Sequence, residues 1–186
     1  IMFLLITDYM KLKIVEPEDI VNHFGEQALS LEKAKQLRNL TNADLGKITQ
    51  ILEDKEGELD LFSDFSVWMR LTYKMDVQGI SKWVDNLSLK GRKQQNLFLS
   101  YAIKMVRECL IYNFASDTLL KTNENEFAFL TKFSPFIHEE NSVMITEKLE
   151  ESIKAINRNA NAKILFFELS LQMVKFLRLK RKFAIK

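Results

Sequence analysis

Residue types that commonly carry out chemistry are sparse in this sequence of 186 residues. It contains one cysteine, Cys109, and two histidines, His23 and His138. A zinc site needs about four ligands at suitable spacing, and these three residues lie far apart in the chain. A single cysteine excludes an intramolecular disulfide and is typical of a reducing compartment, so we expect a cytoplasmic protein. The sequence therefore predicts no metal site, and no residue pattern indicates a cofactor.

Catalytic motifs are also absent from the sequence. It contains no Gly-rich phosphate loop, no HExxH pattern and no nucleophile elbow. Cys109 lies among apolar residues of a helical pattern, so we expect a buried structural thiol. His23 lies near a predicted helix end and His138 directly precedes two glutamates. A surface or capping role is expected for both, rather than that of a general base. We therefore do not expect the chain to be an enzyme by itself.

Beyond Glu168 the sequence carries cations and no acidic residue. A basic segment with interleaved apolar residues could bind a nucleic-acid backbone, with Arg178, Lys180, Arg181 and Lys182 as the candidate contacts. The simpler interpretation, which we favour, is a helix end whose cations complement the helix dipole. Over the whole chain, 27 basic and 25 acidic residues leave a net charge of +2, which gives no general attraction to nucleic acid or to membranes.

The composition predicts an all-α protein with a packed core. Apolar residues make up 47% of the chain, which is ample for such a core. Strands and tight turns normally use glycine and proline, and the sequence contains only five Gly and two Pro. No apolar run reaches the roughly 18 to 20 residues that a membrane span needs, so we expect no membrane contact.

Changes in pattern divide the chain into three parts. Met2–Ile6 and Lys11–Val15 are β-prone runs, which we interpret as strand remnants of a preceding α/β domain. Because the sequence begins with Ile rather than Met, we expect a fragment of a longer protein. Three short helices are predicted within 17–53, where they would form a small bundle. The charged run 53–58 marks a boundary, and longer helices follow from Leu59.

The stretch Ile156–Leu177 is predicted to be a polar turn followed by a helix that is apolar on most of its circumference, with Asn161 as its N-cap. Its apolar residues form two stripes at helical spacing. The first stripe contains Phe166, Leu169, Met173, Phe176 and Leu177. The second contains Ile164, Phe167, Leu171 and Val174. We expect one stripe to fill the core and the other to approach a neighbouring helix or subunit, and the sequence leaves open which does which.

Aromatic residues and methionine are enriched in the cores of protein interfaces. Two predicted helices, 92–113 and the one after Asn161, carry such residues on more than one side. The candidate interface residues are Phe98, Tyr101, Phe166, Phe167, Met173 and Phe176.

Several stretches resemble a known family. Phe65–Tyr73, Trp83–Ser88, Gly91–Leu99 and Asn157–Ser170 resemble the C-terminal part of bacterial DNA polymerase III delta-prime subunits, most closely those of the Bacteroidetes type. Asp19–Leu52 is similar to the lid of the same clamp-loader ATPases. The likeness spans nearly the whole chain and is strongest in its second half.

The resemblance implies an organisation and a function. Residues 1–15 would be the last strand region of an ATPase core, 16–56 a small three-helix lid, and 57–186 a helical collar. The chain would then be a non-catalytic fragment of a clamp-loader subunit in the DNA polymerase III holoenzyme. Its collar would bind the gamma/tau and delta subunits, so that the complex can load the sliding clamp on primed DNA. DNA would be contacted only indirectly, and no cofactor is implied.

Two departures from the family pattern bear on this expectation. Subunits with an arginine finger carry Ser-Arg-Cys near the position of Thr7–Tyr9, and that motif is absent here. The lid arginine that senses nucleotide would fall near Gly46, and it is missing too. Both departures fit a subunit that does not hydrolyse ATP. The alternative from a different class is a helical nucleic-acid-binding module that uses the basic tail.

Overall fold

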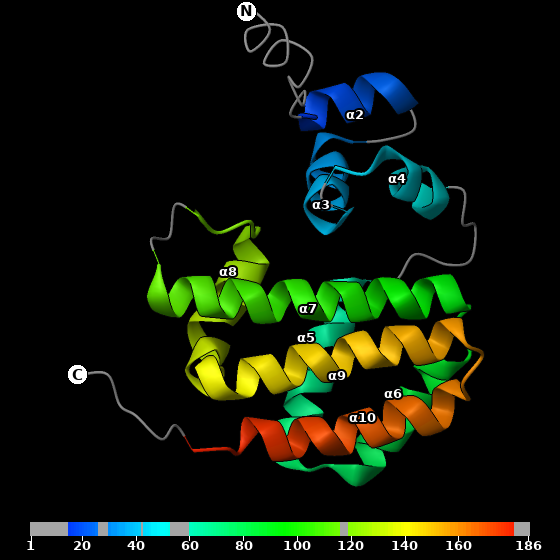
Figure 1. The fold of residues 1–186 in the computed structure, drawn as a ribbon. Helices are drawn as coiled ribbons and strands as arrows, with labels where there is room; N and C mark the ends of the chain where they lie inside the picture. Colours follow the sequence, from blue (N-terminus) through cyan, green and yellow to red (C-terminus); the bar gives the residue numbers. More distant parts are fainter. Residues whose placement is uncertain (1–14, 26–29, 42, 53–59, 116–118, 181–186) are drawn as a thin grey trace, which may run out of the picture. The chain divides into compact units, whose positions relative to one another are not determined.

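The computed structural model describes residues 15–25, 30–41, 43–52, 60–115 and 119–180 (Figure 1). All regular structure within these ranges is helical, which confirms the all-α prediction. The chain divides into two compact units, Ile1–Asp54 and Lys55–Lys186. The two β-prone runs near the N-terminus lie outside the described residues, apart from Val15.

The first unit contains three short helices, α2 (Pro17–Phe24), α3 (Leu31–Thr41) and α4 (Leu45–Leu52). Arg38 on α3 holds the segment before α2 in place. Its Nε donates to the Val15 carbonyl at 2.6 Å, and its guanidinium pairs with Glu16 at 3.3 Å. The small core of this unit consists of buried apolar side chains from all three helices: Ile20, Ala34, Leu37 and Ile48.

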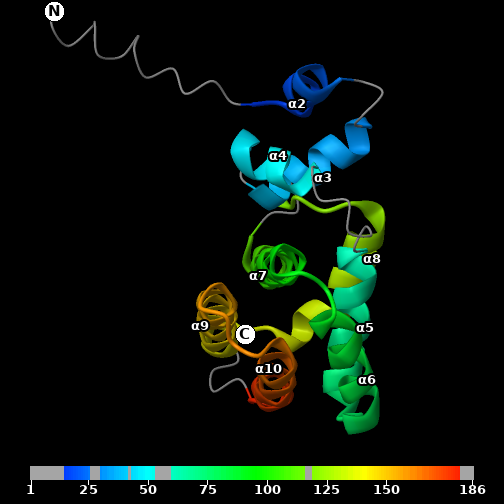
Figure 2. The ribbon, with the colours of Figure 1, turned by 90° about the vertical axis from the view of Figure 1, so that its right-hand side faces the viewer.

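The second unit is a bundle of longer helices in two layers. Its elements are α5 (Leu61–Lys74), α6 (Val77–Ser88), α7 (Arg92–Phe114), α8 (Glu124–Phe133), the short 3-10 helix η2 (Ser134–Phe136), α9 (Glu139–Asn157) and α10 (Ala162–Leu177). Figure 2 shows α7, α9 and α10 nearly end-on, with α5, α6 and α8 forming the layer beside them. Helix α9 packs on both α7 and α10, and α10 also packs on α5 and α6.

Aromatic rings fill the centre of the second unit. Trp68 on α5 and Trp83 on α6 lie parallel, with ring centroids 5.4 Å apart and 6° between the planes. Phe98 on α7 and Phe166 on α10 close the cluster, with centroids 5.5 Å from Trp68 and 6.3 Å from Trp83 respectively. The Trp68 Nε1–H donates to the Ser170 hydroxyl at 2.8 Å, which satisfies the buried indole. Four helices are thereby joined around one cluster.

Two buried glutamates anchor the connection between α7 and α8. Glu126 accepts hydrogen bonds from the Tyr101 hydroxyl at 2.6 Å and from the Lys104 ammonium at 3.0 Å. Glu108 accepts a hydrogen bond from the backbone N–H of Lys121 at 2.9 Å. Burial and the Glu126 carboxylate raise the pKa of Tyr101 above its ordinary value. Charged groups this deep in a protein need such partners, because desolvation otherwise destabilises them.

Capping side chains begin helices α6 and α10, and the second of them confirms the prediction for Asn161. The Asp76 carboxylate accepts a hydrogen bond from the Gly79 N–H at 2.9 Å and starts α6. The Asn161 side chain accepts one from the Ile164 N–H at 3.1 Å and starts α10. Each bond satisfies a backbone donor that the first turn of a helix leaves unpaired.

Two other helices begin with a polar first turn. Helix α8 begins at Glu124, because Asn123 accepts a hydrogen bond from the Glu126 N–H at 2.8 Å and caps that turn. Helix α9 begins at Glu139. In both cases polar residues that resemble a loop form the first helical turn.

Candidate interaction surface

The single cysteine lies in the interior, as predicted. Cys109 on α7 is fully buried. Burial and, second, the charge of Glu108 raise the pKa of its thiol to about 12. The thiolate is the nucleophilic form of cysteine, so this side chain is unreactive near neutral pH.

Alkylation should therefore distinguish the folded from the unfolded chain. We expect iodoacetamide to modify Cys109 about 1,000-fold more slowly in the folded protein at about pH 8, because the thiolate fraction falls by that factor when the pKa rises from 9 to 12. Mass spectrometry of time points gives both rates, with the urea-unfolded chain as the control. Rapid labelling of the folded chain would contradict the burial of this thiol.

The two histidines have different roles. His23 is exposed in the last turn of α2, where its ring lies edge-on to Phe24 at a centroid distance of 4.8 Å. His138 is buried at the N-cap position of α9, so its capping position is confirmed and a surface position is not. Its Nε2 lies 3.1 Å from the Leu179 carbonyl oxygen, and its backbone N–H donates to Asn141 Oδ1 at 2.8 Å. This ring joins the start of α9 to the segment after α10.

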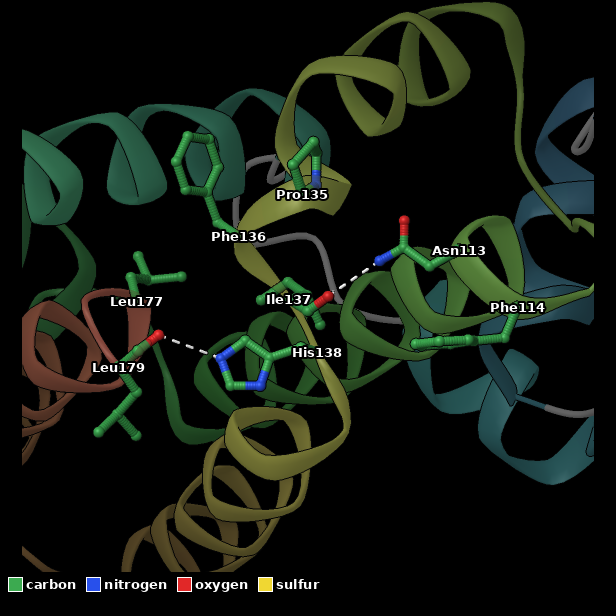
Figure 3. Close-up of a pocket in the computed structure, with 8 residues that line it drawn as sticks. All are labelled: Asn113, Phe114, Pro135, Phe136, Ile137, His138, Leu177 and Leu179. Atoms are coloured by element: carbon green, nitrogen blue, oxygen red, sulfur yellow. Dashed lines mark hydrogen bonds between the residues drawn. The ribbon is translucent and has the colours of Figure 1, made fainter. Parts of the chain in front are cut away.

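A pocket of about 370 Å³ adjoins the His138 ring. Figure 3 shows the Asn113 amide pointing at the Ile137 carbonyl, a hydrogen bond of 2.9 Å, and the His138 ring pointing at the Leu179 carbonyl. These polar groups hold α7, α9 and the end of α10 together. The pocket surface combines polar atoms with the apolar side chains of the other lining residues. Its lining residues are Asn113, Phe114, Pro135, Phe136, Ile137, His138, Leu177 and Leu179.

The structure decides which stripe of α10 faces the core. Buried residues of this helix gather on the side toward α5, α6 and α9, and Ser170 lies among them to receive the Trp68 hydrogen bond. Most of the first predicted stripe is therefore internal, together with Val174 from the second. The buried residues are Phe166, Leu169, Ser170, Met173, Val174 and Leu177.

The opposite side of α10 presents apolar residues to the solvent. Ile164 is 69% exposed and Leu171 is 40% exposed, while Phe167 is partly buried beside them. Exposed apolar residues gathered on one helix face are typical of a surface that binds another protein. We call this side the outer face of α10, and it comprises Ile164, Phe167, Glu168, Leu171, Lys175 and Arg178.

Contacts from α9 hold α10 in register. The Lys148 ammonium pairs with the Glu168 carboxylate at 3.3 Å, and the Asn141 amide donates to the Phe176 carbonyl at 3.1 Å. One contact lies near the middle of α10 and the other near its end, so the helix is fixed along its length. The two helices lie side by side in both Figure 1 and Figure 2.

The turn between α9 and α10 is fixed by α7. The Asn96 amide donates to Asn157 Oδ1 at 2.7 Å, and Arg92 donates to Asn159 Oδ1. Asn159 has a left-handed backbone with φ 64°, a conformation that Asn tolerates better than most residues. The polar residues of this turn thus set the direction in which α10 leaves α9.

Four of the six predicted interface residues fill the core of their own unit. Each is at most 5% exposed, so a partner cannot reach them while the unit is folded. This corrects the prediction for these four, because aromatic residues are also used to pack a core. Phe98 packs on Trp68, Phe166 on Trp83 and Tyr101 on Phe65. Phe167 and Phe176 are partly buried, and Phe167 lies on the outer face of α10. The four buried residues are Phe98, Tyr101, Phe166 and Met173.

Of the four predicted nucleic-acid contacts, the structure describes two. Arg178 and Lys180 are exposed, directly after the end of α10. Arg181 and Lys182 lie outside the described residues. The described cations follow the exposed Leu171 along the chain, so apolar and basic residues occur together at this end of the helix.

Metal-ligating side chains do not gather anywhere in the described part of the chain: no group of three or more His, Cys, Asp and Glu residues there could hold an ion. Of the helices in the described ranges, none is long and apolar enough to cross a lipid bilayer. Comparison with models of protein families, with curated proteins and with solved structures gave no significant match.

Proposed function

We propose that this chain is a non-catalytic subunit fragment of a replicative clamp loader, in the DNA polymerase III holoenzyme of the bacterial cytoplasm. In this proposal residues 16–56 are the lid, and residues 57–186 are the collar that binds the gamma/tau and delta subunits. Assembly through the collar lets the complex load the sliding clamp on primed DNA. The chain itself meets DNA only through that complex.

The outer face of α10 is the observation that carries the proposal. A collar subunit needs helices that pack on their own domain on one side and on a neighbouring subunit on the other. Helix α10 has a fully packed inner side, yet Ile164 and Leu171 remain exposed on the opposite side. The identity of the partners is supported by the resemblance of Phe65–Tyr73 and Asn157–Ser170 to delta-prime subunits.

Binding to the proposed partners is directly measurable. The full chain is mixed at micromolar concentration with the C-terminal domains of the gamma/tau and delta subunits of its source organism, and the mixtures are analysed by size exclusion with light scattering. We expect a stable complex with at least one of them. The double substitution Ile164→Ser and Leu171→Ser should weaken that complex by about 10- to 100-fold, because it removes two apolar contacts from the centre of the interface.

A matched control separates a surface effect from a folding effect. Val143 on α9 is 57% exposed but lies outside the outer face of α10. Val143→Ser should therefore bind like the unsubstituted chain, and circular dichroism should show the same helix content in all variants. If neither domain forms a complex with the unsubstituted chain, the proposal is wrong.

A further inference from the structure

Two charged residues in the first half of α10 form ion pairs within the unit. Lys163, at the start of the helix, pairs with Asp85 on α6 at 2.6 Å. Glu168 pairs with Lys148 on α9 and also accepts a hydrogen bond from the Gln172 amide at 3.2 Å. This half of the helix therefore presents mainly apolar side chains to a partner.

The other half of the helix presents cations that form no ion pair with the described residues of the unit. Lys175, Arg178 and Lys180 are exposed, and among the described residues none of them forms an ion pair. Cations at a helix end often complement the carbonyl groups there. Here donors already reach that end, because Asn141 binds the Phe176 carbonyl and the His138 ring faces the carbonyl of Leu179. Complementing the helix end thus explains little of this positive charge.

The apolar and basic residues follow one line along the helix. Ile164, Leu171 and Arg178 are spaced by seven residues, and Lys175 lies one turn from both Leu171 and Arg178. A seven-residue repeat on one face is the pattern by which a second helix packs along the first. A partner that follows this line meets apolar side chains first and unpaired cations afterwards.

From this arrangement we infer that the outer face of α10 binds an amphipathic helix whose flanking residues are acidic. The inference rests on the proposed function for the source of that helix, which is a helix of a neighbouring clamp-loader subunit. The apolar side of the bound helix packs on Ile164 and Leu171. Its carboxylates pair with Lys175, Arg178 and Lys180, so the charge pattern selects this partner over a basic or neutral helix.

A nucleic-acid backbone fits the same face less well. Phosphates would pair with Lys175 and Arg178, but they offer nothing to Ile164 and Leu171, which occupy half of the line. Binding of duplex DNA through Lys175 and Arg178 would therefore contradict the inference.

Charge reversal on the full chain tests the inference in the subunit complex. The double substitution Lys175→Glu and Arg178→Glu should weaken binding to the gamma/tau or delta domain by about tenfold or more, and affinity of the unsubstituted chain should fall as salt is raised. Lys132→Glu, on the exposed side of α8, is the matched control and should leave affinity unchanged. If the complex forms and the double reversal has no effect, the inference is overturned while the proposed function stands.

Synthetic peptides test the inference independently of the subunits. Two helical peptides share one leucine seam, and their flanking residues are all glutamate in one and all lysine in the other. Fluorescence anisotropy should show that the full chain binds the glutamate peptide at least about tenfold more tightly, with loss of binding in both the Ile164→Ser/Leu171→Ser and the Lys175→Glu/Arg178→Glu variants. This result supports the inference even if no subunit domain binds.

Two further outcomes, one with the peptides and one with duplex DNA, also overturn the inference. In the first, the glutamate peptide binds no more tightly than the lysine peptide. In the second, the full chain binds duplex DNA through Lys175 and Arg178 while the Ile164→Ser/Leu171→Ser variant keeps full DNA affinity, and the glutamate peptide does not compete with the DNA. The second result would assign the cations to nucleic acid.

Discussion

Replacing Trp68 with alanine should lower the free energy of unfolding of the second unit by about 4 kcal/mol. The indole is fully buried, stacks on Trp83 and packs against Phe98. Its removal leaves a cavity between packed helices that cannot fully close around it. It also removes the hydrogen bond that the indole donates to the Ser170 hydroxyl. A loss of this size is a large fraction of the stability of an ordinary domain.

Urea unfolding followed by tryptophan fluorescence gives this value, since Trp83 remains in the variant as a reporter of the same unit. The control is Val67→Ala, one residue along α5, where the side chain is 39% exposed. We expect that change to stay within about 0.5 kcal/mol of the unsubstituted protein. Similar midpoints for the Trp68 and Val67 variants would show that the aromatic cluster is not the centre of the core.

Replacing Glu126 with alanine should destabilise the second unit by about 3 kcal/mol. The carboxylate is buried and receives hydrogen bonds from the Tyr101 hydroxyl, the Lys104 ammonium and the Asn123 N–H. Its loss leaves the mostly buried Lys104 ammonium without its carboxylate partner and removes the N-terminal capping contact of α8. Most of the effect comes from the partners left behind, because their desolvation is no longer compensated.

Glu124→Ala provides the comparison within the same helix. Glu124 is exposed in the first turn of α8, so its removal should cost only about 0.5 kcal/mol through the helix dipole. Urea unfolding of both variants, read by tryptophan fluorescence, measures the difference. Equal effects at the two positions would contradict a specific role for the buried carboxylate.

Much of the helical architecture could be predicted from the sequence, because its signals are local. Asp76 and Asn161 have short side chains that reach the N–H three residues ahead and start helices, and for Asn161 this confirms the prediction. Apolar spacing in the same way identifies the helix that runs from Arg92 to Phe114. These features depend on residues within one or two turns of each other.

Polar residues of the core could not be predicted, because their partners are distant in sequence. Glu108 and Glu126 resemble solvated side chains until the fold places Tyr101, Lys104 and the Lys121 backbone beside them. A hydrogen bond over such separations has no periodic signature.

The outer face of α10 could be predicted only in part. The sequence shows two apolar stripes, but hydrophobicity is nearly the same on both, so it does not say which side is internal. The choice depends on Ser170, a small polar residue on the packed side that receives the Trp68 hydrogen bond. Val174 of the second stripe is buried on that side, whereas Ile164 and Leu171 of the same stripe are exposed.

The hydrogen bond between Trp68 and Ser170 joins residues 102 positions apart, and so it has a consequence for biosynthesis. On the ribosome α5 and α6 are made before α10, which follows all the other described helices of this unit. Until α10 emerges, the stacked indoles lack the contacts of Phe166 and Ser170, and the unfinished bundle exposes aromatic surface. The core of this unit can therefore close only after α10 has been made.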